Sequence, residues 1–445
     1  MRLSVVGCGY LGAVHAVAMA ALGHEVVGID IDAARIEPLA RGQAPFFEPG
    51  FQDLLDEVRP TGRLSFSTRI EDAADREVHF LCVGTPQRPD SLAADLTYVD
   101  AAVESLAAVL APGGRPGWLV GKSTVPVGTA ERIAGRLRLT APQLSLLWNP
   151  EFLREGFAVN DTLHPDRIVY GVAPGAAGQA ATAVLDRVYA ALLADGTPRL
   201  AMDYATAQLV KVAANSFLAV KISFINAMAV LCQAAGGDVG RLAEAIGLDD
   251  RIGPKFLRAG LGYGGGCLPK DVRALVSRAE ELGAGEVFAF LREVDQVNSG
   301  QRTRFTAQAA ELLGGQLRGR RIALLGAAFK PDSDDVRDSP ALTVAQQLTA
   351  AGAVVRIYDP AVAGAVIRAK SAAEAAGSLE AAVAGADLVA VATEWPEFRT
   401  CDPIRLAELA QGRLVLDGRC CLDAARWRAA GWTVVQPGVA SEPFR

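Results

Sequence analysis

Short apolar runs alternate with helical patterns along the first part of the chain. Residues 2–6 (RLSVV) and 25–29 (EVVGI) are apolar, and residues 13–22 between them have the spacing of a helix that ends at Gly23. Strands buried on both faces of a parallel sheet are apolar throughout, and helices connect them. We therefore expect a parallel, doubly wound sheet here. Further strands are expected at residues 78–83, 118–122 and 144–147.

The pattern becomes continuously helical in the middle of the chain. Residues 206–235 contain neither proline nor glycine, and about 30 residues of helix would span roughly 45 Å. Such a length suits a spine between domains, and further helical patterns continue to about residue 313. Gly314 and Gly315 then predict a linker.

A second α/β region follows the linker. It opens with residues 321–326 (RIALLG), whose turn lacks the full glycine pattern, so we do not expect it to hold a dinucleotide in the usual way. The predicted fold class is α/β, with two Rossmann-like doubly wound domains joined by a long central helix and a helical middle domain. The expected later strands are residues 354–358, 388–392 and 414–416, and the expected domains are residues 1–200, 201–313 and 314–445.

Composition narrows the class of protein. The chain has 445 residues, a net charge of −6 and a hydrophobic fraction of 51%, which suits about three folded domains and argues against a nucleic-acid partner. Its seven cysteines form no CxxC pair and its four histidines do not cluster, so we expect neither a disulfide framework nor a metal site. Residue 2 already belongs to a predicted strand, so we expect no signal peptide, and we expect no membrane span. These features predict a cytoplasmic protein.

A glycine-rich turn follows the first strand. Gly7, Gly9 and Gly12 precede a helix, and backbone amides and a helix N-terminus at such a turn can bind a pyrophosphate. Asp30 ends the second strand, where a carboxylate accepts hydrogen bonds from ribose hydroxyls and repels a 2′-phosphate, so NAD is expected rather than NADP. A tight turn without a ligand is the alternative, and Arg35 is either near the adenosine or a solvated surface residue. The expected cofactor contacts here are Gly7, Gly9, Tyr10, Leu11, Gly12, Asp30 and Arg35.

A second glycine-rich segment, GYGGGCLPKD at residues 262–271, contains one cysteine. Its glycines allow the backbone to approach a ligand closely. Cys267 is followed by Lys270 and Asp271, and a thiol beside a cation ionises more easily and becomes a nucleophile. Together with the dinucleotide turn, this pattern indicates sulfur chemistry coupled to hydride transfer. A glycine turn with a small buried cysteine is the alternative.

Polar residues follow other predicted strands, at the sheet edge where ligands bind in open α/β folds. Thr85 in VGTP and Thr124 in GKSTVP could each offer a hydroxyl to a cofactor or to water, although capping a turn explains them equally well. Glu151 and Glu155 in NPEFLREG are four residues apart and could supply a general base, although solvated acids are the simpler interpretation.

Two more groups of polar residues lie on the long helix and after the linker. Lys211 and Asn215 are four residues apart and share one helix face. They could point a cation and an amide at a developing oxyanion, and their apolar neighbours favour a cavity over solvent. Lys330 and Arg337 lie in the charged segment FKPDSDDVRDSP, where they either bind a phosphate or belong to a solvated loop.

These motifs, in this order, resemble the UDP-glucose/GDP-mannose dehydrogenase family over roughly residues 1–419. The resemblance implies an enzyme that oxidises C6 of a nucleotide sugar twice, from alcohol to carboxylate, with two NAD⁺. It also implies an N-terminal domain that binds NAD, a central domain with the cysteine loop, and a C-terminal domain that binds the sugar nucleotide. The most specific segments are KSTVPVGT (122–129), NPEFLREG (149–156), KVAANSFLAVKISFIN (211–226), GYGGGCLPKD (262–271) and FKPDSDDVRDSPA (329–341).

The resemblance implies a catalytic role for several candidate residues. Cys267 would trap the aldehyde as a thiohemiacetal, whose oxidation gives a thioester. Lys211 and Asn215 would stabilise oxyanions, and Asp271 would orient water or the catalytic groups. Water would be positioned or activated by Thr124 and Glu151.

The resemblance also implies ligand contacts. Arg251 resembles a residue that reaches a neighbouring subunit's site, which implies a dimer built on the long helix, either a homodimer or part of a higher homo-oligomer. Lys270 would help the thiol to ionise, and Glu155 would shape the site. Besides the glycine turn, the implied cofactor contacts are Thr85, Thr124, Glu155, Lys270 and Arg337. The implied substrate contacts are Glu151, Phe152, Leu153, Arg154, Glu155, Lys211, Asn215, Arg251, Phe256, Tyr263, Gly264, Lys330 and Arg419.

The choice of substrate depends on two stretches. Residues 149–156 (NPEFLREG) differ from the N-acetylhexosamine branch of the family. Residues 214–219 (ANSFLA) resemble the UDP-glucose branch more than the GDP-mannose branch, so UDP-glucose is expected and another nucleotide sugar is the alternative. The chain departs from the family at Ala227, where many relatives carry a glutamate, and at the three glycines of residues 264–266, which would loosen the loop. A non-enzymatic NAD or sugar-nucleotide sensor, or a one-step hydride enzyme, would not need Cys267.

Overall fold

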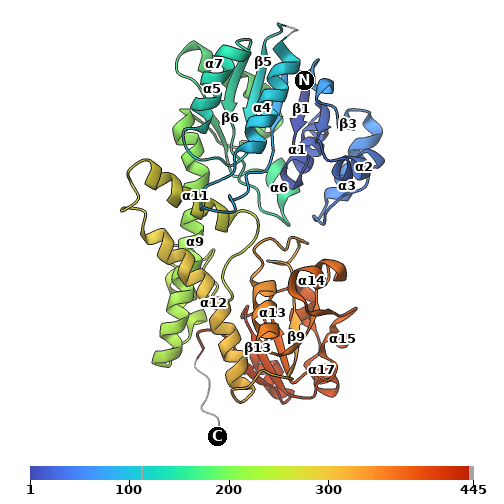
Figure 1. Ribbon diagram of the computed structural model, residues 1–445, viewed down its shortest axis with the longest axis vertical. Helices are drawn as coiled ribbons and strands as arrows, with labels where there is room; N and C mark the ends of the chain where they lie inside the picture. The colour runs from blue at the N-terminus through green and yellow to red at the C-terminus, as the bar shows by residue number, and fades with distance from the viewer. Residues whose placement is uncertain (112–113, 440–445) are drawn as a thin grey trace. The chain divides into compact units, whose positions relative to one another are not determined.

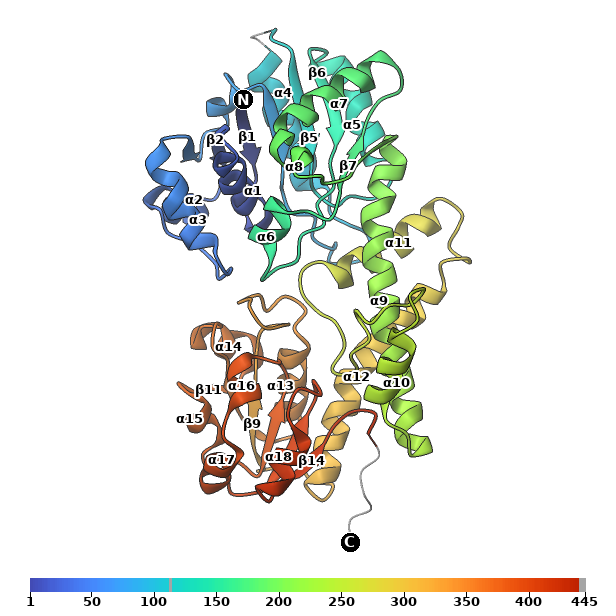
Figure 2. The ribbon, with the colours of Figure 1, turned by 180° about the vertical axis from the view of Figure 1, so that it is seen from behind.

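The computed structural model describes residues 1–111 and 114–439, and the chain packs as two compact units. Unit 1 comprises Met1–Ala214 and Arg273–Gly283, and unit 2 comprises Asn215–Val272 and Ala284–Arg445. Each unit is built on its own β-sheet (Figures 1 and 2). The predicted fold class is confirmed, and the three domain boundaries stay a prediction.

The sheet of unit 1 has eight strands in the order β3-β2-β1-β4-β5-β6-β7-β8. This is the doubly wound order expected of a dinucleotide-binding fold, extended by two strands. The described strand pairs are parallel except β6 and β7, which run antiparallel where Trp148 opposes Gly171, so the expectation of a fully parallel sheet is wrong at this one pair. The strands are β1 (Arg2–Val6), β2 (Glu25–Ile29), β3 (Leu64–Ser67), β4 (Val78–Leu81), β5 (Gly117–Gly121), β6 (Leu144–Trp148), β7 (Ile168–Gly171) and β8 (Arg199–Met202).

Helices cover both faces of this sheet. Leu3 and Val5 of β1 pack on one side with α1, α3 and α7, whereas Val6 packs on the other side with α4 and α5, as the alternation of side chains along a strand requires. The helices are α1 (Tyr10–Ala21), α2 (Ala33–Arg41), α3 (Phe51–Val58), η1 (Arg59–Thr61), η2 (Ile70–Ala73), α4 (Thr97–Leu110), α5 (Thr129–Thr140), α6 (Ala158–Leu163), α7 (Ala176–Val188) and α8 (Ala190–Ala194).

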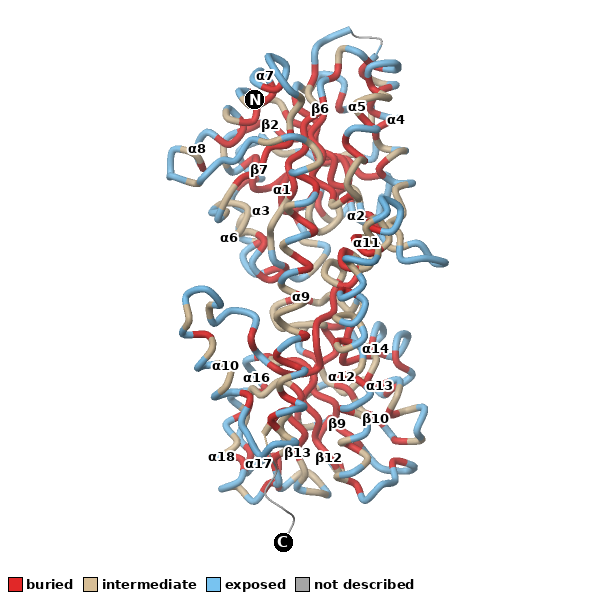
Figure 3. Tube along the Cα trace, turned by 90° about the vertical axis from the view of Figure 1, so that its left-hand side faces the viewer, coloured by how far each residue is buried: buried red, intermediate tan, exposed pale blue. Residues whose placement is uncertain are grey.

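The sheet of unit 2 repeats the same strand order with six parallel strands, β11-β10-β9-β12-β13-β14. The central strands of both sheets are buried (Figure 3). The strands are β9 (Arg321–Leu325), β10 (Val354–Tyr358), β11 (Glu374–Ala375), β12 (Leu388–Val391), β13 (Leu414–Asp417) and β14 (Thr433–Val435). The helices are α13 (Pro340–Ala350), α14 (Gly364–Ser371), α15 (Leu379–Val383), α16 (Pro396–Thr400), α17 (Pro403–Leu409) and α18 (Ala424–Ala429).

The expected long helix is α9 (Tyr204–Ala235), with 32 residues. The boundary between the units falls inside it, between Ala214 and Asn215. Its length and a mean hydropathy of 1.7 over its most apolar window satisfy the criteria for a membrane span, with 33% of that window buried. Long helices of water-soluble enzymes satisfy the same criteria, so this one helix is weak evidence for a span. The other helices of the middle region are α10 (Val239–Gly247), α11 (Leu268–Glu281) and α12 (Phe290–Leu312).

Candidate active site

The glycine-rich turn between β1 and α1 has the geometry of a phosphate site. Gly7 has φ +93°, which favours glycine. A side chain at position 12 would place its Cβ 1.8 Å from the carbonyl oxygen of Gly7, so α1 can begin here only with glycine at that position. Among the described residues, no side chain caps the N-terminus of α1 at Tyr10. The first amides of the helix can therefore bind an anion.

Asp30 lies at the carboxyl end of β2, beside this turn, and is 7% exposed. Its carboxylate accepts hydrogen bonds from the amides of Cys8 (2.8 Å) and Asp32 (2.9 Å). Arg35 Nη1 lies 3.4 Å from Asp30 Oδ2 and its side chain is 53% exposed, so Arg35 lies beside the turn and also at the surface. A fixed carboxylate next to a phosphate-binding turn fits NAD, because ribose hydroxyls can donate to it and a 2′-phosphate would be repelled.

A buried carboxylate that the sequence did not reveal connects this turn to the NPEFLREG segment. Glu48 accepts hydrogen bonds from the Tyr10 hydroxyl and from the amides of Gly156 (2.6 Å) and Ala158 (2.7 Å). Burial and the Glu48 carboxylate raise the pKa of Tyr10, so its hydroxyl remains a donor. Glu48 therefore fixes the end of the NPEFLREG segment against the start of α1.

Glu151 and Lys211 form a buried ion pair in unit 1. Lys211 Nζ lies 2.9 Å from Glu151 Oε1, and the side chains are 5% and 10% exposed. The other carboxylate oxygen accepts from the amide of Leu153 at 2.8 Å, and the Phe152 ring centre lies 5.8 Å from Lys211 Nζ. Glu151 is therefore not a solvated acid. A carboxylate held in this way can serve as a general base or position water.

Three more predicted residues of unit 1 are Thr85, Glu155 and Arg154. The hydroxyl of Thr85 donates to the carbonyl oxygen of Thr124 at 2.7 Å, so it stabilises the two loops that follow β4 and β5. Glu155 is 8% exposed. Arg154 donates through Nε and Nη2 to Asp161 (2.8 and 2.6 Å), which holds its guanidinium at the entrance of α6.

Cys267 lies in unit 2 directly before α11, which begins at Leu268. The N-terminus of a helix favours negative charge. The carbonyl oxygen of Cys267 accepts from the amide of Asp271 at 3.0 Å. The Asp271 carboxylate, 2% exposed, accepts from Asn215 Nδ2 (2.7 Å) and pairs with Lys270 Nζ (2.6 Å). The predicted nucleophile, amide and carboxylate thus belong to one connected group.

The glycines before Cys267 pack against the FKPDSDDVRDSP segment. A Cβ at position 264 would lie 2.3 Å from the carbonyl oxygen of Asp338, and one at position 266 would lie 2.2 Å from Arg337 Cζ. The amide of Gly265 donates to the carbonyl oxygen of Arg337 at 2.9 Å. The side chain of Arg337 pairs with Asp335 at 2.7 Å. The third glycine therefore creates the space that the Arg337 guanidinium occupies.

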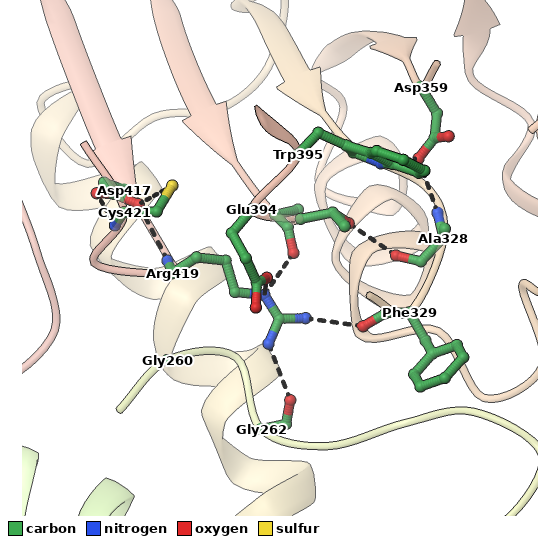
Figure 4. Close-up of polar contacts among 12 residues, drawn as sticks. Gly260, Gly262, Ala328, Phe329, Asp359, Glu394, Trp395, Asp417, Arg419 and Cys421 are labelled. Carbon is green, nitrogen blue, oxygen red and sulfur yellow. Dashed lines mark hydrogen bonds and ion pairs between the residues drawn. The ribbon is translucent and has the colours of Figure 1, made fainter. Parts of the chain in front are cut away.

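Arg419 holds the same loop from the carboxyl end of β13 (Figure 4). Its guanidinium donates to the carbonyl oxygens of Ala392 (2.7 Å), Gly262 (3.1 Å) and Phe329 (3.3 Å), and it pairs with Glu394 at 3.5 Å. Three carbonyls from three separate segments converge on this one side chain. Arg419 therefore fixes the cysteine loop in place.

Four other predicted substrate contacts, Tyr263, Lys330, Arg251 and Phe256, lie in unit 2. The amide of Tyr263 donates to Asn298 Oδ1 at 2.7 Å. Lys330 Nζ lies 5.4 Å from the Phe329 ring centre. The Arg251 side chain is 89% exposed and pairs with Asp249. Phe256 has φ +65°, which is uncommon for an aromatic residue and marks local strain.

The predicted residues thus gather in two clusters, one in each unit. Thr85, Thr124, Glu151 and Lys211 belong to unit 1, whereas Asn215, Cys267 and Asp271 belong to unit 2. Helix α9 contributes one residue to each cluster, Lys211 to the first and Asn215 to the second. The two residues are about one helical turn apart along α9.

Comparison with known proteins identifies relatives along the whole chain. Three profiles of the UDP-glucose/GDP-mannose dehydrogenase family match it: the NAD binding domain at residues 1–193, the central domain at 205–300 and the UDP binding domain at 323–424. UDP-glucose 6-dehydrogenase of Rhizobium meliloti (strain 1021) is 41% identical, with 94% of this chain and 95% of that protein covered. UDP-glucose 6-dehydrogenase of Pseudomonas aeruginosa is 40% identical, with 97% and 96% covered.

Solved structures resemble this chain in the same way. A UDP-glucose dehydrogenase from the hyperthermophilic archaeon Pyrobaculum islandicum is 39% identical, with a TM-score of 0.87 and 97% and 98% of the two chains covered. A GDP-mannose dehydrogenase from Pseudomonas aeruginosa is 29% identical, with a TM-score of 0.54 and 95% and 97% covered. The expected cofactor, NAD, agrees with the matched NAD binding domain.

Proposed function

The chain belongs to the UDP-glucose/GDP-mannose dehydrogenase family, and from that premise we propose that it oxidises UDP-glucose to UDP-glucuronate in two NAD-dependent steps. The observation that carries this proposal is the position of Cys267 directly before α11, one helical turn from an Asp271 that Asn215 and Lys270 hold. A sensor or a one-step hydride enzyme has no need of a nucleophile in such a setting.

The proposed reaction assigns a task to each cluster. NAD⁺, when bound at the glycine turn, accepts one hydride at each oxidation. After the first oxidation the Cys267 thiolate adds to the C6 carbonyl and forms a thiohemiacetal, and loss of a second hydride turns this into a thioester. Glu151 then takes a proton from water as the water attacks the thioester, which releases the carboxylate and restores the thiol. Two NAD⁺ and one water are consumed per sugar.

The polar partners stabilise the charge that develops on C6 oxygen. Lys211 carries a positive charge in a nearly dry position, where a cation interacts strongly with an oxyanion. Asn215 uses one N–H of its amide for Asp271 and has a second for an oxyanion. Asp271 acts on Asn215 and on the first turn of α11 and is a positioning residue in this scheme.

UDP-glucose is the proposed substrate because the relatives with 39–41% identity carry that name. A UDP-D-ManNAc dehydrogenase from Pyrococcus horikoshii has the same TM-score of 0.87 but only 28% identity, and the GDP-mannose enzyme has 29% identity and a TM-score of 0.54. A kcat/KM for GDP-mannose equal to or above that for UDP-glucose would overturn this choice and leave the two-step chemistry standing.

The stoichiometry and the covalent intermediate test the reaction. Limiting UDP-glucose should yield about two NADH per sugar under the two-step scheme, and a ratio of one with free aldehyde would contradict it. Glu151→Gln keeps the thiol and removes the base, so intact-protein mass spectrometry with UDP-glucose and NAD⁺ should show a covalent sugar-nucleotide adduct. Cys267→Ser should show no thioester and at most a trace of turnover, because a serine hydroxyl hardly ionises near neutral pH.

We also propose that the enzyme is a cytoplasmic homodimer built on α9. Phe217, Phe224 and Leu231 are spaced by seven residues on this helix and are 66%, 52% and 58% exposed. An apolar stripe at that spacing favours helix packing against a second copy. Light scattering after size exclusion should give twice the mass of the chain, and Phe217→Glu with Phe224→Glu should give the monomer mass. A wild-type monomer at micromolar concentration would refute the dimer.

A further inference from the structure

Glu48 is a buried carboxylate to which the scheme above assigns no task. It lies in the loop between α2 and α3 and is 6% exposed. The three groups that donate hydrogen bonds to it are all neutral: the Tyr10 hydroxyl and the amides of Gly156 (2.6 Å) and Ala158 (2.7 Å). A buried carboxylate with neutral donors costs more desolvation than a neutral side chain in the same place. A carboxylate at this position is therefore a candidate for a role beyond packing.

The segment that Glu48 holds has no regular structure of its own. Residues 149–157 belong to neither a helix nor a strand, so the hydrogen-bond ladders of helices and sheets do not fix their backbone. Gly156 has φ +77° and turns the chain into α6. Phe157, which precedes α6, has no side-chain acceptor for the first amides of that helix, and Glu48 supplies one from a distant part of the chain. The conformation of this segment therefore depends on contacts with other elements.

Polar contacts fix this segment near both of its ends. At the beginning, Asn149 Oδ1 accepts from the Tyr189 hydroxyl at 2.6 Å. At the end, the Glu48 carboxylate and the Tyr10 hydroxyl both accept from the amide of Gly156, at 2.6 and 3.0 Å. Tyr10 is the first residue of α1, so these contacts connect the end of the segment to the helix of the cofactor turn. The implied substrate contacts of the segment lie between the two fixed ends.

We propose that Glu48 is a positioning residue for the nucleotide sugar, because it holds the Gly156 end of the NPEFLREG segment in the conformation that binds this ligand. The inference rests on the proposed function, since it assumes that the segment contacts the nucleotide sugar. A segment that is already fixed loses less conformational entropy on binding, so its ligand binds more tightly. The Glu151 carboxylate is held separately, by Lys211 and by the amide of Leu153. Loss of Glu48 should therefore weaken binding of the nucleotide sugar more than it slows the chemical steps.

Glu48→Gln tests the proposal, because glutamine has almost the same shape but offers one acceptor oxygen and one NH₂ donor. That donor would face one of the two backbone N–H groups, so one amide loses its acceptor. We expect Kd for UDP-glucose, measured calorimetrically without NAD⁺, to rise about tenfold. We expect kcat at saturating UDP-glucose to change by less than about threefold. Hydrogen exchange at residues 150–158 should become faster in the variant.

Tyr10→Phe and Gln52→Met separate the parts of this arrangement. Tyr10→Phe leaves both amide bonds of Glu48 and removes only the link to α1, so we expect a smaller rise in Kd, of about threefold. Gln52 holds the same loop at its α2 end, where Oε1 accepts from the amide of Ala44 (2.9 Å) and Nε2 donates to the carbonyl oxygen of Gly42 (2.9 Å). Gln52→Met is therefore the matched control: it should lower the melting temperature and leave Kd for UDP-glucose and exchange in the segment at their wild-type values.

Two results would overturn the inference. Wild-type Kd for UDP-glucose and wild-type exchange of the segment in both Glu48→Gln and Tyr10→Phe, with a lower melting temperature, would show that Glu48 is structural. A rise in Kd for Gln52→Met as large as that for Glu48→Gln would assign the effect to the loop as a whole. A wild-type enzyme that forms no NADH from UDP-glucose would instead contradict the proposed function, so the two failures are distinguishable.

Discussion

Breaking the ion pair between Lys211 and Glu151 should destabilise unit 1 by several kcal/mol. The atoms are 2.9 Å apart and the side chains are 5% and 10% exposed. With an effective dielectric constant of about 20, this distance gives a gross attraction of about 6 kcal/mol, and the cost of removing both charges from water offsets part of it. Lys211→Met or Glu151→Gln leaves a buried charge without this counter-ion, and we expect each to cost about 3 kcal/mol.

Thermal unfolding measures this cost without relying on activity. A domain of roughly 150–250 residues loses about 2–4 °C of Tm per kcal/mol, so the transition that reports on unit 1 should fall by about 6–12 °C in each variant. The double variant lacks both charges of the pair, so neither is left buried without its counter-ion. We therefore expect its loss to be smaller than the sum of the single losses by about 2 kcal/mol or more.

An exposed ion pair in the same unit provides the control. Arg132 and Asp100 lie 2.8 Å apart with side chains 45% and 32% exposed, and such a pair contributes at most about 1 kcal/mol. Arg132→Met should therefore change Tm by less than about 4 °C. Losses in Lys211→Met and Glu151→Gln no larger than in this control, or strictly additive losses in the double variant, would refute the reasoning.

Three other residues of unit 1 carry further predictions. Asp30 should give NAD⁺ at least a tenfold higher kcat/KM than NADP⁺, since a phosphate beside a carboxylate costs about 1.4 kcal/mol or more, and equal values would contradict the assignment. Gly12→Ala should raise the KM for NAD⁺ at least tenfold, because its methyl would lie 1.8 Å from the Gly7 carbonyl oxygen; initial rates with varied NAD⁺ decide this. Burial lowers the pKa of His79 to about 4, so below about pH 6.5 only the unfolded state takes up its proton and the stability of unit 1 falls as pH drops toward 4, by up to about 3 kcal/mol. His79→Gln should flatten this slope in denaturant titrations, and an unchanged slope would count against it.

Apolar runs predicted most of the buried strands, because a strand buried on both faces consists largely of apolar residues. β7 was missed although all four of its residues are buried. β1, β2 and β10 have the predicted bounds. Strands at the sheet edges left no such signal. β3 is only partly buried and β8 is largely exposed, so their residues read as loop. The long helix was predictable because neither proline nor glycine interrupts it, and it begins two residues earlier than expected.

The sequence predicted which residues belong to the candidate site better than it predicted which of them pair with one another. The pairing of Lys211 with Glu151 joins two segments far apart in sequence, and an acid in a loop reads as solvated until its burial is known. Glu48 gave no signal, because a single glutamate before proline and glycine resembles a surface turn. The glycines at 264–266 were expected to loosen the loop, and this stays a prediction. In the structure they lie against Arg337, Phe329 and Asp338 at distances that leave no room for a side chain.

The two sheets share one strand order, yet only the first retains an open phosphate turn. In unit 1, α1 begins at Tyr10 directly after the turn, and Asp30 accepts from the amide of Cys8. In unit 2, the equivalent Asp359 accepts from the amides of both Ala327 and Ala328 and from the Trp395 indole.

The helix that follows the second turn is also displaced along the chain. α13 begins only at Pro340, where Ser339 caps it, so the turn lacks a helix N-terminus that could hold a pyrophosphate. The segment inserted between turn and helix carries Phe329 and Arg337, which pack against the glycines before Cys267. This segment therefore supports the cysteine loop from the place where unit 1 has the start of its phosphate-binding helix, and the expectation that the second turn does not hold a dinucleotide in the usual way stays a prediction.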